Sequence, residues 1–319
     1  MDIDRAIGLL VGLAFGDVYG LDYEYWWPRP RELWLDVKDL DFGCYDECDK
    51  KCCYSDDTEM AIILAESILS QQGFKEDNFA KLLSQKACRN YRARFYGYST
   101  KKVIAAIRSG IPWYEASRIP FNGLGSYGNG AAIRVAPIAI FAKDISEVEK
   151  LSKRQAIVTH RHSLAIEGSI LIALAQRFVL EGIPPSLLID KLLSYRTWLP
   201  EFKKRLEVVE QLLDSLPPIV AKTLGNTSAS HESTVTAIYI FIKSQGDALK
   251  ALAYSISVGG DVDSIAAMAL SLVGAYKGYK AFPQDLLNRI ENIDYIINLA
   301  KELYLLHILN KLKGSSSRY

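Results

Sequence analysis

Two widely separated segments of the chain concentrate oxygen-bearing side chains at predicted helix starts. They are Ser55-Asp56-Asp57-Thr58 and Gly259-Gly260-Asp261-Val262-Asp263-Ser264. Each leads directly into apolar residues at helical spacing, the second into Ile265 to Ala275. Two such helix starts can face each other across a cleft, and together they hold more oxygen ligands than helix capping requires.

Helix capping alone is the simpler interpretation of the first segment. Asp56 as the N-cap and Glu59 three residues later would form a capping box, and the helix dipole favours both carboxylates. The same chemistry recurs in the second segment, and this recurrence favours a ligand site.

A cation would explain such a gathering of carboxylates. Four of them in one place would repel one another and raise each other's pKa values unless a positive ion lay among them. Oxygen ligands favour magnesium, manganese or calcium over zinc, and two ions about 3.5–4 Å apart would fit this number of ligands. The candidate metal ligands are Ser55, Asp56, Asp57, Asp261, Asp263 and Ser264.

Length and composition predict a large globular core. The chain has 319 residues, 49% of them hydrophobic, and its 38 basic and 37 acidic residues leave a formal net charge of +1. This balance argues against a general nucleic-acid or membrane-surface binder. The apolar run Ala6 to Phe15 is too short to span a bilayer and too acidic at its front for a secretory leader, so we expect a cytoplasmic protein.

Four of the five cysteines crowd together, at positions 44, 48, 52 and 53. Their spacing matches no zinc or iron–sulfur motif. We therefore expect a surface loop with incidental thiols or one disulfide, rather than a metal site. A thiol-based redox or metal module is an alternative function that depends on this cluster alone.

Other segments carry weaker signals. Gly16 and Gly20 suggest a turn after the first helix, and Trp26 to Lys51 reads as an irregular lid or loop. The glycine-rich run Phe121 to Gly130 precedes an apolar helix and can form a phosphate cradle, although such runs are often only turns. The pair His160 and His162, beside an arginine, could recognise an anion.

Helical spacing dominates the rest of the sequence, and convincing strands are scarce. We predict an all-α fold, a single compact orthogonal multi-helix domain over residues 1–313, followed by a flexible tail over 314–319. The predicted helices are Asp4 to Phe15, one beginning at Thr58, Glu76 to Arg94, Thr100 to Ser109, Ala131 to Ala142, Ser146 to Val158, Leu164 to Leu180, Ser186 to Tyr195, Pro200 to Leu213, Ser233 to Lys243, Asp247 to Ser257, Ser264 to Lys277 and Ile293 to Leu312.

Five motifs, in this order, resemble the signatures of the ADP-ribosylglycohydrolase family. They extend over nearly the whole chain, and their order is far more specific than any one of them. The motifs are Gly16-Asp17-Val18-Tyr19-Gly20 with Glu24, Ser55-Asp56-Asp57-Thr58, Gly128-Asn129-Gly130-Ala131-Ala132-Ile133-Arg134, Thr159-His160 and Gly259-Gly260-Asp261-Val262-Asp263-Ser264.

The resemblance implies a function and a set of site residues. It implies an all-helical hydrolase in which the six candidate ligands bind a pair of Mg²⁺ ions, for which Mn²⁺ can substitute. It also implies that Glu24 is the catalytic carboxylate. Its expected partners are ADP-ribosylated proteins or ADP-ribose-containing small molecules and polymers, and we expect a monomer. The implied substrate contacts are Phe121, Gly125, Ser126, Tyr127, Gly128, Asn129, Gly130 and His160.

The glycine-rich run is most similar to the branch of the family that cleaves O-linked ADP-ribose, from serine, poly(ADP-ribose) or O-acetyl-ADP-ribose. The arginine-specific branch is the alternative, and a non-catalytic ADP-ribose-binding relative is another. Ser55 and Ser264 stand where the family usually has threonine, and serine keeps the hydroxyl that binds metal. The cysteine-rich loop has no counterpart among the family features.

Overall fold

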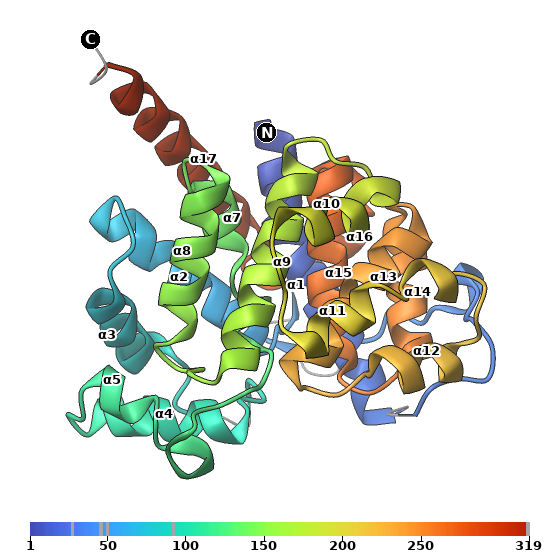
Figure 1. Cartoon of the computed structure of the whole chain (residues 1–319), viewed down its shortest axis with the longest axis horizontal. Coiled ribbons are helices and arrows are strands. Elements are labelled where there is room, and N and C mark those ends of the chain that lie inside the picture. Colours follow the sequence, from blue (N-terminus) through green and yellow to red (C-terminus); the bar gives the residue numbers. More distant parts are fainter. Residues whose placement is uncertain (27–28, 45–46, 49–50, 91–92, 317–319) are drawn as a thin grey trace.

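The computed structural model describes residues 1–26, 29–44, 47–48, 51–90 and 93–316, and helices dominate this part of the chain (Figure 1). The α-helices are α1 (Ile3–Trp26), α2 (Asp56–Gln71), α3 (Glu76–Lys86), α4 (Tyr98–Arg108), α5 (Trp113–Ala116), α6 (Gly130–Ile133), α7 (Ala136–Phe141), α8 (Ile145–Ala156), α9 (Ser163–Leu180), α10 (Leu188–Tyr195), α11 (Pro200–Leu206), α12 (Pro217–Leu224), α13 (Ser230–Ser244), α14 (Ala248–Val258), α15 (Val262–Lys277), α16 (Gln284–Leu287) and α17 (Ile293–Ser316). Short 3₁₀ helices are η1 (Val37–Asp39), η2 (Pro120–Gly123), η3 (Pro185–Leu187), η4 (Glu210–Leu212) and η5 (Tyr279–Ala281). The predicted all-α fold is confirmed.

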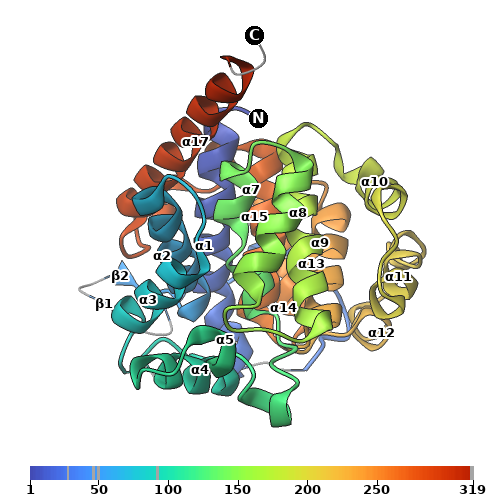
Figure 2. The same cartoon turned by 60° about the vertical axis from the view of Figure 1, so that its left-hand side comes forward.

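Helices α1 and α15 lie side by side through the centre of the molecule (Figure 2). Four glycines of α1, spaced by four residues, line this contact: Gly8, Gly12, Gly16 and Gly20. A Cβ atom on any of them would stand 2.2–2.8 Å from the backbone of α15 or of the residues that follow it. The missing side chains therefore allow the two backbones to approach closely, and we call this contact the glycine seam.

The seam corrects the turn predicted at Gly16 and Gly20. Both glycines lie inside α1, which continues to Trp26 instead of ending near Phe15. Glycine lowers helix propensity, but the packing of α1 against α15 offsets that cost, so these glycines serve the helix–helix contact and not chain reversal.

The remaining helices surround this central pair. Helices α9, α13 and α14 pack on α15, and α17 packs on α1, α2 and α7. The far end of α17 projects beyond the body of the protein (Figure 1). Two segments, Ile3–Glu24 and Ser163–Leu180, are long and apolar enough to cross a membrane, yet 89% and 83% of their apolar windows are buried inside the protein, as in core helices.

Several helix ends differ from the prediction. The helix expected over Ala131 to Ala142 is split into α6 and α7, because Pro137 has no N–H to donate to the carbonyl of Ile133. Helix α3 ends at Lys86, and the Arg108 guanidinium donates to the carbonyls of Ser84 and Ala87 at that end. At the C-terminus α17 continues to Ser316, whereas residues 317–319 lie outside the described part of the chain.

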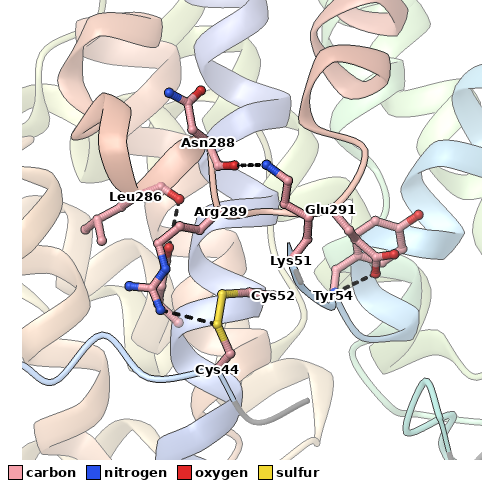
Figure 3. The surroundings of a disulfide bond; sticks show 9 residues. Cys44, Lys51, Cys52, Tyr54, Leu286, Asn288, Arg289 and Glu291 are labelled. Carbon is pink, nitrogen blue, oxygen red and sulfur yellow. Dashed lines mark hydrogen bonds between the residues drawn. A yellow bond between two sulfur atoms is a disulfide. The ribbon is translucent and has the colours of Figure 1, made fainter. Parts of the chain in front are cut away.

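The cysteine-rich segment forms the only described β-strands, a hairpin of β1 (Glu47–Cys48) and β2 (Lys51–Cys52). A disulfide joins Cys44 to Cys52 beside Arg289 (Figure 3). Cys53 is also disulfide-bonded, and Cys52 and Cys53 are both buried, so these residues are not incidental surface thiols. Cys52 exchanges backbone hydrogen bonds with Arg289 and Glu291, which fixes the chain just before Ser55.

Candidate active site

The two acidic helix starts converge. The Ser264 hydroxyl, in the first turn of α15, donates a hydrogen bond of 3.0 Å to Asp57 Oδ2, in the first turn of α2. These residues are 207 positions apart in the chain. The predicted cleft between the two helix starts is therefore present.

Glu24 lies at the end of the glycine seam. It is four residues after Gly20, whose Cα faces Asp263 so closely that a Cβ there would stand 2.8 Å from the Asp263 Cα. Oxygen atoms of Glu24, Asp261 and Asp263 all lie within 4.8 Å of one another. Glu24 Oε2 is buried and has no hydrogen-bond partner within the described residues. This is the site at which the described residues could hold a metal ion.

Asp17 supports the first helix start from behind. It is fully buried and accepts hydrogen bonds from the backbone N–H groups of Ser55, at 3.1 Å, and Thr58, at 3.0 Å, and from the Thr58 hydroxyl at 2.6 Å. The carboxylate thereby fixes the backbone that carries Asp56 and Asp57.

The capping box proposed for α2 is wrong. Ser55 is the N-cap, and its hydroxyl accepts from the N–H of Asp57 at 3.2 Å. Glu59 instead accepts from the N–H of Cys88 at 2.9 Å and from the Tyr96 hydroxyl at 2.5 Å. Asp56 is thus not required as a cap, and its side chain lines the cleft.

The carboxylates raise one another's pKa values. Burial, with the neighbouring acids adding to it, raises the pKa of Asp56, Asp57 and Asp263 well above the usual value for aspartate. For Asp261, burial and then the charge of Glu24 raise the pKa to about 7. Without a positive charge, the cluster is most stable with some of its carboxylates protonated.

The glycine-rich run forms one wall of the cleft. Asn129 donates from its amide to Asp261 Oδ2 at 2.5 Å and to the Ser233 hydroxyl at 3.0 Å, which ties this wall to α15 and α13. The backbone of the run pairs with the start of α13, where the N–H of Ser230 donates to the Tyr127 carbonyl at 3.1 Å.

His160 is buried behind this wall and is uncharged at neutral pH. Burial and then the nearby Arg134 charge lower the pKa of His160 to about 3, and its Nδ1 shares a hydrogen bond of 2.7 Å with the Thr159 hydroxyl. A Cβ on Gly130 would stand 3.2 Å from His160 Nε2. His162 is the N-cap of α9, where its Nδ1 accepts from the N–H of Leu164 at 3.2 Å.

A cavity of about 370 Å³ unites most of the predicted site. The rings of Phe121 and Tyr127 lie 4.9 Å apart at its rim. Of the predicted residues, Ser55 and Gly125 do not line it: Ser55 is fully buried as the N-cap, and Gly125, at φ +79°, backs onto Arg161. The predicted residues that do line it are Glu24, Asp56, Asp57, Phe121, Ser126, Tyr127, Gly128, Asn129, Gly130, His160, Asp261, Asp263 and Ser264.

Sequence reasoning missed several contributors to this cavity. The additional lining residues are Leu21, Phe95, Gly97, Tyr98, Ser99, Thr100 and Ser228. Of the residues between Phe95 and Thr100, only Thr100 belongs to a predicted helix, at its start. The glycine spacing of four in α1 was a visible signal for the seam that positions Glu24. No pattern in the sequence indicated Phe95 or the role of Asp17.

Comparison with known proteins agrees with this architecture. Residues 1–313 match the family described as ADP-ribosylglycohydrolase. ADP-ribosylhydrolase ARH3 of Bos taurus is 32% identical over 95% of this chain and 93% of its own length, and ARH3 of Homo sapiens is 32% identical over 79% and 78%. A solved structure titled "ADP-ribosylglycohydrolase-related protein complex" shares the fold, with a TM-score of 0.70 at 24% identity over 96% of this chain and 98% of that one. The resemblance seen in the sequence is confirmed, and the chain belongs to the ADP-ribosylglycohydrolase family of hydrolases.

Proposed function

We propose that the protein releases ADP-ribose by hydrolysing an O-glycosidic bond at the anomeric carbon of the terminal ribose, in a reaction that requires Mg²⁺. The observation that carries the proposal is the convergence of two acidic helix starts on Glu24, with a carboxylate oxygen that is buried and unpaired. Substrates of this kind are serine-linked ADP-ribose, poly(ADP-ribose) and O-acetyl-ADP-ribose.

The residues at the cleft fit a pair of hard cations. Asp56, Asp57 and Asp263 are carboxylates whose pKa values burial has raised, and a nearby cation would stabilise their ionised forms. Asp261 and Ser264 complete an all-oxygen set, whereas Ser55 is fully buried as the N-cap of α2 and does not line the cavity. Bound Mg²⁺ would supply Lewis-acid polarisation and a template for the ribose hydroxyls. Mn²⁺ offers the same coordination.

Glu24 is the residue placed to act as the general base. Its carboxylate would take a proton from the attacking water as the new bond to the anomeric carbon forms, while the C–O bond to the leaving group breaks and that oxygen takes up a proton. The glycine seam holds Glu24 at a fixed position relative to Asp263. Such fixed placement is what lets one carboxylate contribute strongly to an oxocarbenium-like reaction.

The glycine-rich wall would bind the diphosphate and the adenosine. Gly128 and Gly130 have no side chain at this wall, so phosphate oxygens can approach its backbone closely. The N–H groups of Gly128 and Asn129 already donate to the Ser126 hydroxyl, at 3.2 Å, and to the Ser228 carbonyl, at 2.9 Å. His160 is uncharged and contributes a hydrogen bond rather than a positive charge. The paired rings of Phe121 and Tyr127 offer a surface for adenine.

The test combines one variant with removal of the cation. Glu24→Gln should lower the turnover number at least about 100-fold while ADP-ribose still binds, measured by calorimetry, because only the proton acceptor is lost. Chelation should abolish activity, and added Mg²⁺ should restore it. A Glu24→Gln enzyme with normal turnover would remove Glu24 from the role, and full activity in excess chelator would disprove the metal requirement.

A substrate panel assigns the linkage. Serine-linked, O-acetylated and arginine-linked ADP-ribose are compared at equal concentration, and we expect release from the O-linked compounds. Preference for the arginine-linked compound would place the protein in the N-glycosidic branch instead. Binding of ADP-ribose without release from any of the three would indicate a non-catalytic binding protein.

A further inference from the structure

Phe95 has a backbone conformation that bulky residues rarely adopt. Its φ is +58°, in the left-handed region, where a side chain with a Cβ is disfavoured. Strained residues of this kind persist when the surrounding structure imposes the conformation, and they cluster at functional sites.

Both neighbours of Phe95 are held in place. Arg94 forms an ion pair with Glu291, lies 3.6 Å from Glu59, and stacks 4.3 Å above the ring of Tyr54. On the other side, the Tyr96 hydroxyl donates to Glu59 at 2.5 Å. These contacts fix the chain before and after Phe95, so the residue between them is presented to the cavity in its strained form.

The position of Phe95 places it at the acidic end of the cleft. The carbonyl of Arg94 accepts a hydrogen bond of 2.7 Å from the N–H of Asp56, and Phe95 and Asp56 line the same cavity. Phe121 is a second phenylalanine of this cavity with a left-handed backbone, at φ +54°, but it pairs with Tyr127 in the glycine-rich wall. The cavity therefore has two strained phenylalanines with different surroundings.

We propose that Phe95 is a specificity-determining residue that contacts the leaving group of the substrate. This inference rests on the proposed function, in which the terminal ribose binds at the carboxylates and its anomeric carbon carries the leaving group. Phe95, whose neighbour Arg94 is hydrogen-bonded to Asp56, would then meet what is attached to that carbon, whereas Phe121 would meet the ADP part that all substrates share. An aromatic ring at this position would favour a leaving group that has apolar or planar surface beyond the scissile oxygen, such as a peptide chain.

Two substrates with the same bond test this assignment: ADP-ribosylserine and a peptide ADP-ribosylated on serine. Phe95→Gly should lower kcat/KM for the peptide at least about fivefold, the scale of one lost aromatic contact, and leave kcat/KM for ADP-ribosylserine within about twofold. Phe95→Tyr, which keeps the ring, should behave like the wild type. Phe121→Ala is the matched control and should lower kcat/KM for both substrates by the same factor.

The thermal midpoint separates a functional role from a structural one. Glycine accepts φ +58° without strain, so Phe95→Gly should unfold within about 2 °C of the wild type or above it. The assignment would be overturned if Phe95→Gly lowered kcat/KM equally for both substrates or cleaved the peptide faster than the wild type. A large fall in its thermal midpoint would also overturn the assignment. If the wild type cleaves neither substrate but releases ADP-ribose from O-acetyl-ADP-ribose or poly(ADP-ribose), the assignment to Phe95 is overturned. If it releases ADP-ribose from none of these compounds, the proposed function itself fails. If the wild type is active and Phe95→Gly leaves the ratio of kcat/KM for the peptide to kcat/KM for ADP-ribosylserine unchanged, only the role of Phe95 is refuted.

Discussion

The glycine seam between α1 and α15 can be tested with a single methyl group. Gly12→Ala would place a Cβ 2.2 Å from the carbonyl oxygen of Leu270 and 2.8 Å from the ring of Phe282. The nearest atom belongs to the backbone of a buried helix and cannot rotate away. To reach an ordinary contact of 3.4 Å, the two helices must separate by about 1.2 Å at this point.

The expected loss of stability follows from two opposing contributions. Forcing extra volume into a packed interior costs roughly 1–3 kcal/mol, and the upper end applies here because the obstacle is backbone. Alanine is a better helix former than glycine by about 1 kcal/mol, which offsets part of this cost. The net destabilisation is about 2 kcal/mol. With an unfolding entropy near 2.1 cal/mol/K for each of the 319 residues, the midpoint should fall by about 3 °C.

Thermal unfolding followed by circular dichroism and calorimetry measures this shift. Gly73→Ala is the matched control, because its Cβ would meet only one atom, at 3.9 Å, and its midpoint should stay within about 1 °C. Gly20→Ala brings the same perturbation next to Asp263, and we expect it to reduce activity more than Gly12→Ala does, since Glu24 is one helical turn away. A Gly12→Ala protein as stable as the wild type, or more stable, would refute the idea of a tight seam.

Three further predictions concern residues that do not line the cavity. Asp17→Asn should lower the free energy of unfolding by about 1–3 kcal/mol for each N–H or O–H donor of Ser55 or Thr58 that is left unpaired, measured by denaturant unfolding. It should also weaken Mg²⁺ binding, measured by calorimetry. Unchanged stability would contradict the support role of Asp17. Burial lowers the pKa of His307 to about 4, below its unfolded value near 6.5, so the folding stability that this difference contributes is present above pH 6.5 and is lost as the pH falls toward 4. Between pH 7 and pH 5 the free energy of unfolding of the wild type should therefore fall by about 2 kcal/mol more than that of His307→Gln. Equal acid sensitivity of the two proteins would argue against this. Replacing both Cys44 and Cys52 by serine should lower the free energy of unfolding by about 2–3 kcal/mol, because the disulfide closes a loop over a sequence separation of 8 and so restricts the unfolded chain. A thermal midpoint equal to that of the wild type under oxidising conditions would show that the disulfide contributes nothing.

Residue types and local periodicity determined much of this protein. Apolar spacing predicted the helical fold, and the runs Ser55 to Thr58 and Gly259 to Ser264 already carried the chemistry of the site, because helix starts and oxygen ligands are local features. The order of the motifs was enough to indicate the family. Helix limits were less predictable, as at Lys86, where contacts from Arg108 decide the end.

The tertiary structure alone decided how these parts meet. Gly16 and Gly20 suggest a turn from sequence alone because their effect depends on the backbone of α15, which is more than 240 residues away in sequence and invisible to local patterns. The same holds for Asp17, whose hydrogen-bond donors lie 38–41 residues further along, and for Phe95, whose φ is imposed by the partners of Arg94 and Tyr96. Long-range packing sets these positions, since it fixes backbone geometry that the propensity of a short segment does not determine.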